Sequence, residues 1–145
     1  LMQQSLILNK RLKLMNMIEE QYVSFETAKL AKEKGFKHKS NYFYLGVKNK
    51  NKLVHCAVPE DNNGLDGFTC VTQSLLARWL REKHNIWVQI SYYYPYSIVV
   101  YVCYIGNDEK CSFPDTETKI FTTYEDAMEA GLQEALKLIE SENKI

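Results

Sequence analysis

The sequence has no excess of charge of either sign and no close pair of cysteines. Lysine and arginine together number 18, as do aspartate and glutamate, so the formal net charge is zero. A protein that binds nucleic acid by neutralising phosphates usually carries a basic excess, which is missing here. The cysteines at positions 56, 70, 103 and 111 form no C-x-x-C motif, whereas zinc sites usually show paired ligands at close spacing. We therefore expect neither a metal site nor a cofactor.

Long apolar runs are also missing. The longest, Ile98 to Ile105, is far too short to span a bilayer, so we expect no membrane contact. Near the N-terminus, Leu6 to Leu8 is too short for a secretory signal, and basic residues follow it. We expect a cytoplasmic protein with reduced thiols. Residues 1–22 are predicted to be an extension or flexible leader, and residues 23–145 a single α+β domain.

The sequence contains no recognisable catalytic motif. It has no Gly-x-Ser-x-Gly elbow and no glycine loop of the kind that holds phosphates, and its glycines number only 6. Glu82 and His84 stand two residues apart on a predicted helix, so they do not face the same way. These observations lean against an enzyme. A small-molecule site or an active site assembled from scattered residues remains a third alternative.

Three segments have the capping residues and the apolar spacing of helices. The first is expected over Ser24–Lys34, with Ser24 as its cap and Gly35 as its stop. The last is expected over Thr123–Glu140, with an apolar stripe that ends at Ile139. The middle one, Thr72–His84, has the clearest pattern. The residues expected to share its apolar side are Leu75, Leu76, Trp79, Leu80 and Lys83.

Strands are predicted between these helices. The predicted strands are Asn41–Val47, Lys52–Val58, Ile86–Tyr94, Ile98–Ile105 and Glu117–Phe121. The first two form a hairpin, and Ile98–Ile105 is apolar on both faces, as in a central strand. The second half thus has the order helix, strand, strand, strand, helix. We predict an α+β fold, a two-layer sandwich in which helices pack mainly on one face of an antiparallel sheet.

Three stretches together resemble a known group of proteins. They are Ala28–Phe36, Thr72-Gln73 followed by Trp79–Ile86, and Tyr124–Ala130. The combination resembles small uncharacterised proteins from phages and mobile elements of gut Bacteroides-type bacteria, and the likeness runs from about Ser24 onward. Its most specific part is Trp-Leu-Arg-Glu-x-His, while Val71 stands where the group commonly has proline. No activity is assigned to that group, so the resemblance implies only a setting: a phage or prophage product in the bacterial cytoplasm.

Aromatic residues and arginines mark a candidate binding surface. Tyrosine, tryptophan and arginine are the usual anchors of protein interfaces. Trp87 and Tyr93 lie on the more polar face of their predicted strand, and the preceding helix supplies two arginines. The leading hypothesis is a non-catalytic accessory protein that binds a host or phage protein; the alternative is that a helix covers Trp87 and Tyr93 as core. The candidate binding residues are Trp87, Tyr93, Arg78, Arg81, Tyr92 and Tyr94.

Nucleic-acid binding is the second hypothesis. The predicted element order is also that of double-stranded RNA-binding domains, and the tyrosines around position 93 can stack on single-stranded bases. Against it, Glu125, Asp126 and Glu129 occupy the start of the last helix, where such domains grip phosphates with basic residues. The candidate nucleic-acid patch consists of Lys29, Lys32, Lys34, Lys37 and Lys39. The sequence predicts no particular oligomeric state.

Overall fold

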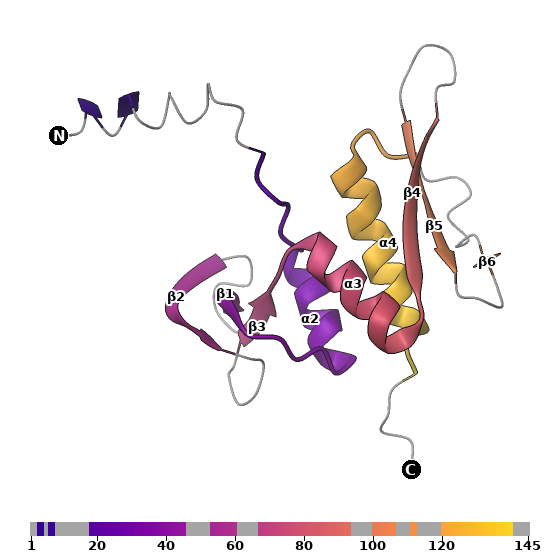
Figure 1. Ribbon diagram of the computed structural model, residues 1–145, viewed down its shortest axis with the longest axis horizontal. Coiled ribbons are helices and arrows are strands. Elements are labelled where there is room, and N and C mark those ends of the chain that lie inside the picture. Colours follow the sequence, from indigo (N-terminus) through magenta and orange to yellow (C-terminus); the bar gives the residue numbers. More distant parts are fainter. Residues whose placement is uncertain are drawn as a thin grey trace.

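The computed structural model describes residues 3–4, 6–7, 18–45, 53–60, 67–93, 100–106, 111–112 and 120–140. Helices and antiparallel sheets form an α+β fold, as predicted (Figure 1). The elements follow in the order α2 (Phe25–Glu33), β1 (Ser40–Leu45), β2 (Leu53–Glu60), β3 (Gly67–Cys70), α3 (Gln73–His84), β4 (Trp87–Tyr93), β5 (Val100–Gly106), β6 (Cys111–Ser112) and α4 (Tyr124–Leu138). Within the described part of the chain, no helix is both long enough and apolar enough to cross a membrane.

The structure confirms helix α2 and both of its predicted ends. The hydroxyl of Ser24 accepts a hydrogen bond from the backbone N–H of Thr27 at 3.3 Å. At the other end, Gly35 adopts a φ of 86°, a conformation that favours glycine. The N–H of Phe36 then bonds to the carbonyl of Ala31 at 2.9 Å. This glycine stop turns the chain so that the side chain of Phe36 enters the core.

Helix α3 is confirmed as well, and so is most of its predicted apolar side: Leu76 and Leu80 are buried, and Leu75 and Trp79 pack against the core. Thr72 caps it by accepting a hydrogen bond from the N–H of Leu75 at 3.3 Å, and Asn85 ends it in the left-handed region with a φ of 52°. Lys83, expected on the apolar side, is exposed, because the ammonium group stays in water near the end of the helix. The residues that are buried are Gln73, Leu76, Ala77 and Leu80.

Helix α4 carries the apolar stripe that the sequence predicts. The hydroxyl of Thr123 accepts a hydrogen bond from the N–H of Asp126 at 3.1 Å and so caps the helix. The stripe packs against both β4 and β5. Its buried residues are Ala127, Met128, Gly131, Leu132, Ala135 and Leu136, and Ile139 is buried directly after the helix.

The first sheet has the strand order β2-β1-β3, with both pairs antiparallel. The β1–β2 pair confirms the predicted hairpin. Strand β3 was not predicted, because its four residues are too few to show an alternating pattern. It approaches β1 so closely that a Cβ atom at Gly67 would lie 2.9 Å from the carbonyl oxygen of Tyr44. Glycine is therefore required at the start of β3.

The second sheet has the strand order β4-β5-β6, so β5 is its central strand, as predicted. Strands β4 and β5 pair without a break from Trp87 opposite Gly106 to Tyr93 opposite Val100. The predicted strand Glu117–Phe121 lies mostly outside the described residues, and the third strand of the described sheet is β6.

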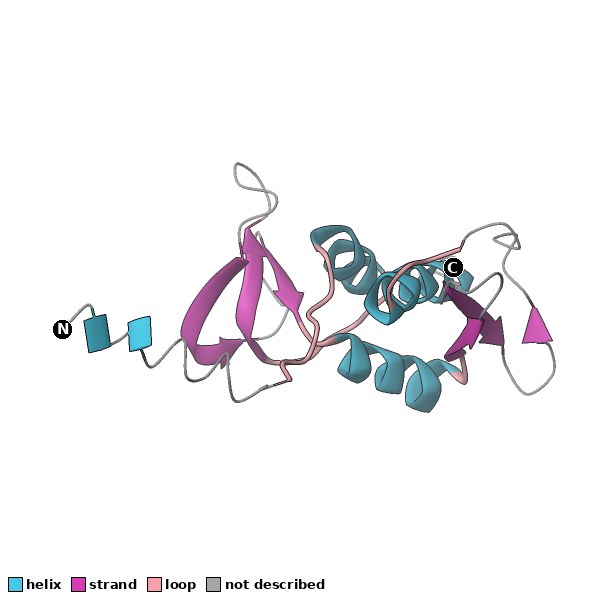
Figure 2. Ribbon diagram, turned by 90° about the horizontal axis from the view of Figure 1, so that it is seen from above, coloured by secondary structure: helices cyan, strands magenta, loops and turns pink. Residues whose placement is uncertain are grey.

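The helices lie between the two sheets (Figure 2). Helix α2 packs on β3, helix α4 packs on β4 and β5, and both α2 and α3 pack on α4. The predicted arrangement of the second half is thus present, with helices on one face of its sheet, and the first sheet adds a layer beyond α2. The largest buried side chains include Phe36, Leu76, Leu80, Ile105, Leu132 and Leu136.

Residues 21–23 run alongside residues 71–73. The N–H of Val23 donates to the carbonyl of Val71 at 3.0 Å, and the N–H of Gln73 donates to the carbonyl of Gln21 at 2.8 Å. These bonds hold the chain beside the start of α3 from Gln21 onward. Most of the predicted extension, residues 1–22, lies outside the described residues.

Candidate functional site

The sequence-predicted binding surface has Trp87 at its centre. Its side chain is 52% exposed at the start of β4, so the alternative in which a helix covers Trp87 as core is wrong. The guanidinium carbon of Arg81, from α3, lies 5.6 Å from the centroid of the indole ring. This distance is that of a cation–π contact, which fixes the ring against the end of the helix. The structure therefore brings together two of the predicted binding residues.

Arg78, the second predicted arginine, is engaged within its own helix. Its Nε atom lies 2.7 Å from Oε1 of Glu82, one turn along α3. The hydrogen bond and the opposite charge of the partner raise the pKa of Arg78 and lower the pKa of Glu82. The ion pair is solvent-exposed, so it contributes little to stability. A binding partner would have to compete with Glu82 for this guanidinium.

Tyr92 does not join the surface formed by Trp87 and Arg81. Tyr92 is 76% exposed, but strand alternation places it on the face of the sheet that carries Val88 and Ile90, opposite Trp87. Val88 and Ile90 pack on the buried core, whereas Tyr92 extends beyond it. The side chain of Tyr93 and all of Tyr94 lie outside the described residues.

The lysines of the candidate nucleic-acid patch divide into two groups. The amine of Lys32 donates to the carbonyl of Gly67 at 3.0 Å and lies 5.3 Å from the ring centroid of Phe68. The amine of Lys34 donates to the carbonyl of Ile139, at the end of α4, at 2.8 Å. These two lysines hold elements of the fold together. The lysines of the patch that are exposed are Lys29, Lys37 and Lys39.

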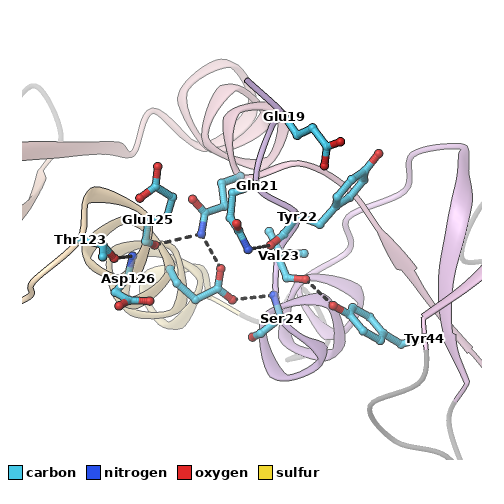
Figure 3. Close-up of a pocket in the computed structure, with 11 residues that line it drawn as sticks. Glu19, Gln21, Tyr22, Val23, Ser24, Tyr44, Thr123, Glu125 and Asp126 are labelled. Atoms are coloured by element: carbon cyan, nitrogen blue, oxygen red, sulfur yellow. Dashed lines mark hydrogen bonds between the residues drawn. The ribbon is translucent and has the colours of Figure 1, made fainter. Parts of the chain in front are cut away.

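A pocket that the sequence analysis missed lies where the three helices begin. Its volume is about 520 Å³. Figure 3 shows Thr123, Glu125 and Asp126 on one side of it and Tyr22 and Tyr44 on the other. The pocket is lined by Glu19, Gln21, Tyr22, Val23, Ser24, Tyr44, Gln73, Thr123, Glu125, Asp126 and Glu129. Carboxylates are frequent among these residues, which include no lysine, arginine or histidine.

The carboxylate of Glu129 forms the hub of this pocket. Its Oε1 atom accepts hydrogen bonds from the backbone N–H of Ser24, at 2.7 Å, and from the hydroxyl of Thr27. Its Oε2 atom accepts a hydrogen bond from the side-chain amide of Gln73 at 2.9 Å. One carboxylate thereby joins the first turns of α2 and α3 to α4. Because these donors all come from the chain itself, Glu129 acts as a structural junction.

Hydrogen bonds to the backbone also hold Tyr44, which forms one wall of the pocket. The hydroxyl of Tyr44 and the thiol of Cys70 both donate to the carbonyl of Val23, at 2.7 Å and 3.5 Å. Burial raises the pKa of Cys70 to about 11 and raises the pKa of Tyr44 well above its usual value. Both groups are therefore protonated at neutral pH. A thiol in this state is a poor nucleophile.

The hydrogen bonds around Glu129 could hardly be predicted from the sequence. Gln73 is a polar residue in the first turn of an amphipathic helix, and Glu129 directly follows the buried Met128. Polar residues beside an apolar stripe usually lie at its solvated border, so neither indicates a buried contact. Only the packing of the three helices brings them together.

Among the described residues, no group of three or more histidine, cysteine, aspartate or glutamate side chains is placed to hold a metal ion. Comparisons of the chain with models of protein families, with curated proteins and with solved structures gave no match.

Proposed function

We propose that this protein is a non-catalytic accessory protein of a phage or prophage, which binds a host or phage protein in the bacterial cytoplasm. The observation that carries the proposal is the exposed indole of Trp87 beside the guanidinium of Arg81. Tryptophan and arginine are the residue types most enriched among the side chains that dominate binding energy at interfaces.

The composition around Trp87 supports this proposal. No charged residue occurs from Ile86 to Asn107, a stretch that includes β4 and β5. Depletion of charge together with aromatic residues is typical of the centre of a protein interface. Arg81 supplies the cation at the border of the stretch, and a guanidinium can bind a carboxylate of a partner with two parallel hydrogen bonds.

A catalytic function in the pocket around Glu129 has less support than protein binding through Trp87. Its central carboxylate is hydrogen-bonded to three donors of the chain, and Cys70 beside it is held protonated. Nucleic-acid binding also has weaker support, because Lys32 and Lys34 donate to backbone carbonyls of the fold. Three lysines of that patch are left facing solvent.

The test is a capture experiment with three tagged baits in a lysate of a gut Bacteroides strain. The baits are the wild-type chain, Trp87→Ala and Leu45→Ala. Leu45 is a control because it is an apolar residue of comparable exposure, 44%, on the first sheet. Each lysate is divided into nuclease-treated and untreated halves, and the bound proteins are identified by mass spectrometry.

We expect one protein to be retained by the wild type and by Leu45→Ala, with and without nuclease, and to be lost with Trp87→Ala. Equal retention by all three baits would place binding away from Trp87. Retention that disappears after nuclease treatment would instead indicate nucleic-acid binding, and the exposed lysines would be the next residues to replace.

A further inference from the structure

Among the residues that the structure describes, strand β4 is a long edge strand with none of the usual protection. It forms one end of the sheet β4-β5-β6 and pairs with β5 along all of its seven residues (Figure 1). In the described part of the chain, no strand pairs with its other edge. An edge strand offers a row of unpaired backbone N–H and C=O groups, so natural proteins usually protect it with charges, proline, a bulge or short length.

The other sheet edges of this protein do show such protection. Strand β2 contains Pro59, ends at the acidic Glu60, and has an irregular register with β1. Strand β3 is only four residues long, and the amine of Lys32 binds the carbonyl of Gly67 at its start. Strand β6 has two residues. Strand β4 has no charge, no proline, no glycine and no break in register.

The types of side chain along β4 are arranged nearly symmetrically about its central residue, Ile90. The sequence Trp-Val-Gln-Ile-Ser-Tyr-Tyr has an aromatic residue at each end, and its polar residues Gln89 and Ser91 flank the central Ile90. If two copies pair antiparallel about Ile90, then Trp87 faces Tyr93, Val88 faces Tyr92, and Gln89 faces Ser91. Aromatic and β-branched residues opposite each other stabilise antiparallel pairs, and a two-fold axis requires this self-complementarity.

The exposure of Tyr92 fits this arrangement. It continues the register of Val88 and Ile90, which contact the core, yet it is 76% exposed. In the antiparallel pair each Tyr92 lies against Val88 of the second copy, so the exposed ring gains an apolar neighbour. The strand has no charge that would select an unrelated partner strand instead.

We propose that β4 pairs antiparallel with β4 of a second copy of this chain, which joins two three-stranded sheets into one sheet of six strands. This inference goes beyond the proposed function, because it concerns the edge of the sheet and not its outer face. In the pair, both Trp87 side chains lie on the same face of the continuous sheet. A dimeric or clustered partner would then be bound at two points at once, which strengthens binding without any new contact.

The experiment uses two double variants of the full chain, analysed by light scattering after gel filtration. One carries Gln89→Lys and Ser91→Lys, and the other carries Gln89→Glu and Ser91→Glu. Gln89 is exposed and Ser91 is half-buried, and both lie on the face opposite Val88 and Ile90, so the core is left intact. In the proposed register each double variant places like charges opposite each other, whereas a mixture of the two places opposite charges together.

We expect the wild type to have twice the 17.0 kDa mass of one chain, each double variant to have the mass of one chain, and the mixture to regain the doubled mass. A wild type with the mass of one chain at its highest soluble concentration would overturn the proposal. So would a folded double variant that still dimerises alone, or a mixture that stays monomeric. If the variants fail to fold, hydrogen exchange of the wild type decides: the amides of β4 should become more protected as protein concentration rises, and unchanged protection would also overturn it.

Discussion

The carboxylate of Glu129 accepts a hydrogen bond from the side-chain amide of Gln73, 2.9 Å away, although the two residues belong to different helices. The amide nitrogen of Gln73 also donates to the carbonyl of Glu125 at 3.0 Å, so the first turn of α3 is bound twice to α4. The second carboxylate oxygen binds Ser24 at the start of α2. One side chain thus links the starts of all three helices, in addition to their apolar packing.

Replacing Glu129 with glutamine should destabilise the protein. The new amide keeps one accepting oxygen, but its nitrogen is a donor that meets the donating amide of Gln73. A hydrogen bond to a charged group contributes about 1.5–3 kcal/mol, so we expect the free energy of unfolding in urea to fall by about that amount. Glu134→Gln is the matched control on the same helix. Glu134 forms a surface ion pair with Lys137, and its loss should change stability by less than about 1 kcal/mol. Equal effects of the two substitutions would show that Glu129 is not the junction.

Stability should decrease at alkaline pH because of Cys70. Burial raises the pKa of the thiol from 9.0 to about 11 in the folded chain. The folded state then holds a proton that the unfolded state releases, so stability is complete below pH 9 and is lost as the pH rises toward 11. One such group changes the free energy of unfolding by about 1.4 kcal/mol for each pH unit within this window.

The measurement is urea unfolding at several pH values for the wild type and for Cys70→Ala. The variant should be less stable at neutral pH, but its stability should fall less steeply above pH 9. Tyr44 remains in both proteins, and its raised pKa adds a further loss of stability above the usual tyrosine pKa of 10.0, so the two proteins are compared below that pH. Parallel curves for the two proteins would contradict the role of the thiol.

Removing the indole of Trp87 should leave the fold intact. Its ring is half exposed, and the contact with Arg81 is worth about 0.5–1 kcal/mol at an exposed site. We therefore expect Trp87→Ala to unfold in urea within about 1.5 kcal/mol of the wild type. Leu80→Ala, which empties a fully buried position of α3, should cost about 2–5 kcal/mol. A Trp87→Ala variant as unstable as Leu80→Ala would mean that Trp87 is part of the core.

A methyl group at Gly67 should disturb the pairing of β3 with β1. The added Cβ would meet the carbonyl oxygen of Tyr44 at 2.9 Å, and this oxygen belongs to the backbone and cannot rotate away. We expect Gly67→Ala to lower the free energy of unfolding by roughly 1–3 kcal/mol. Ser74→Ala, at an exposed position of α3, serves as the control and should have a smaller effect. Hydrogen exchange of β1 and β3 would report the change locally, and unaltered protection there would refute it.

Sequence patterns predicted the features that depend on neighbouring residues. The predicted caps Ser24 and Thr72 are confirmed, and of the two candidates Thr122 and Thr123 it is Thr123 that caps α4. Each cap binds a donor that lies three residues ahead on the same chain. The central position of β5 was predicted from its composition, because a run that is apolar on both faces is typical of a strand in the interior of a sheet.

Features that depend on distant residues were not predictable in the same way. Strand β3 is defined by its pairing with β1, which lies earlier in the chain. Its own four residues are too few to show a periodic pattern. The surroundings of Glu129 are fixed by residues far away in the chain, so its position on a helical wheel indicates only a border residue. By contrast, the placement of Tyr92 and Trp87 on opposite faces of β4 follows from strand alternation alone and was predictable from the sequence.

The position of Glu129 after both α2 and α3 in the sequence has a consequence for the newly synthesised protein. Its acceptor oxygens reach back to Ser24 and Thr27 over 105 and 102 residues, and to Gln73 over 56. A nascent chain that has formed α2 and α3 therefore still lacks their shared acceptor until the last helix leaves the ribosome. Contacts of such long sequence separation form slowly, because loop closure must precede them. Helix α4, which is translated after α2 and α3, thus locks the first helix in place.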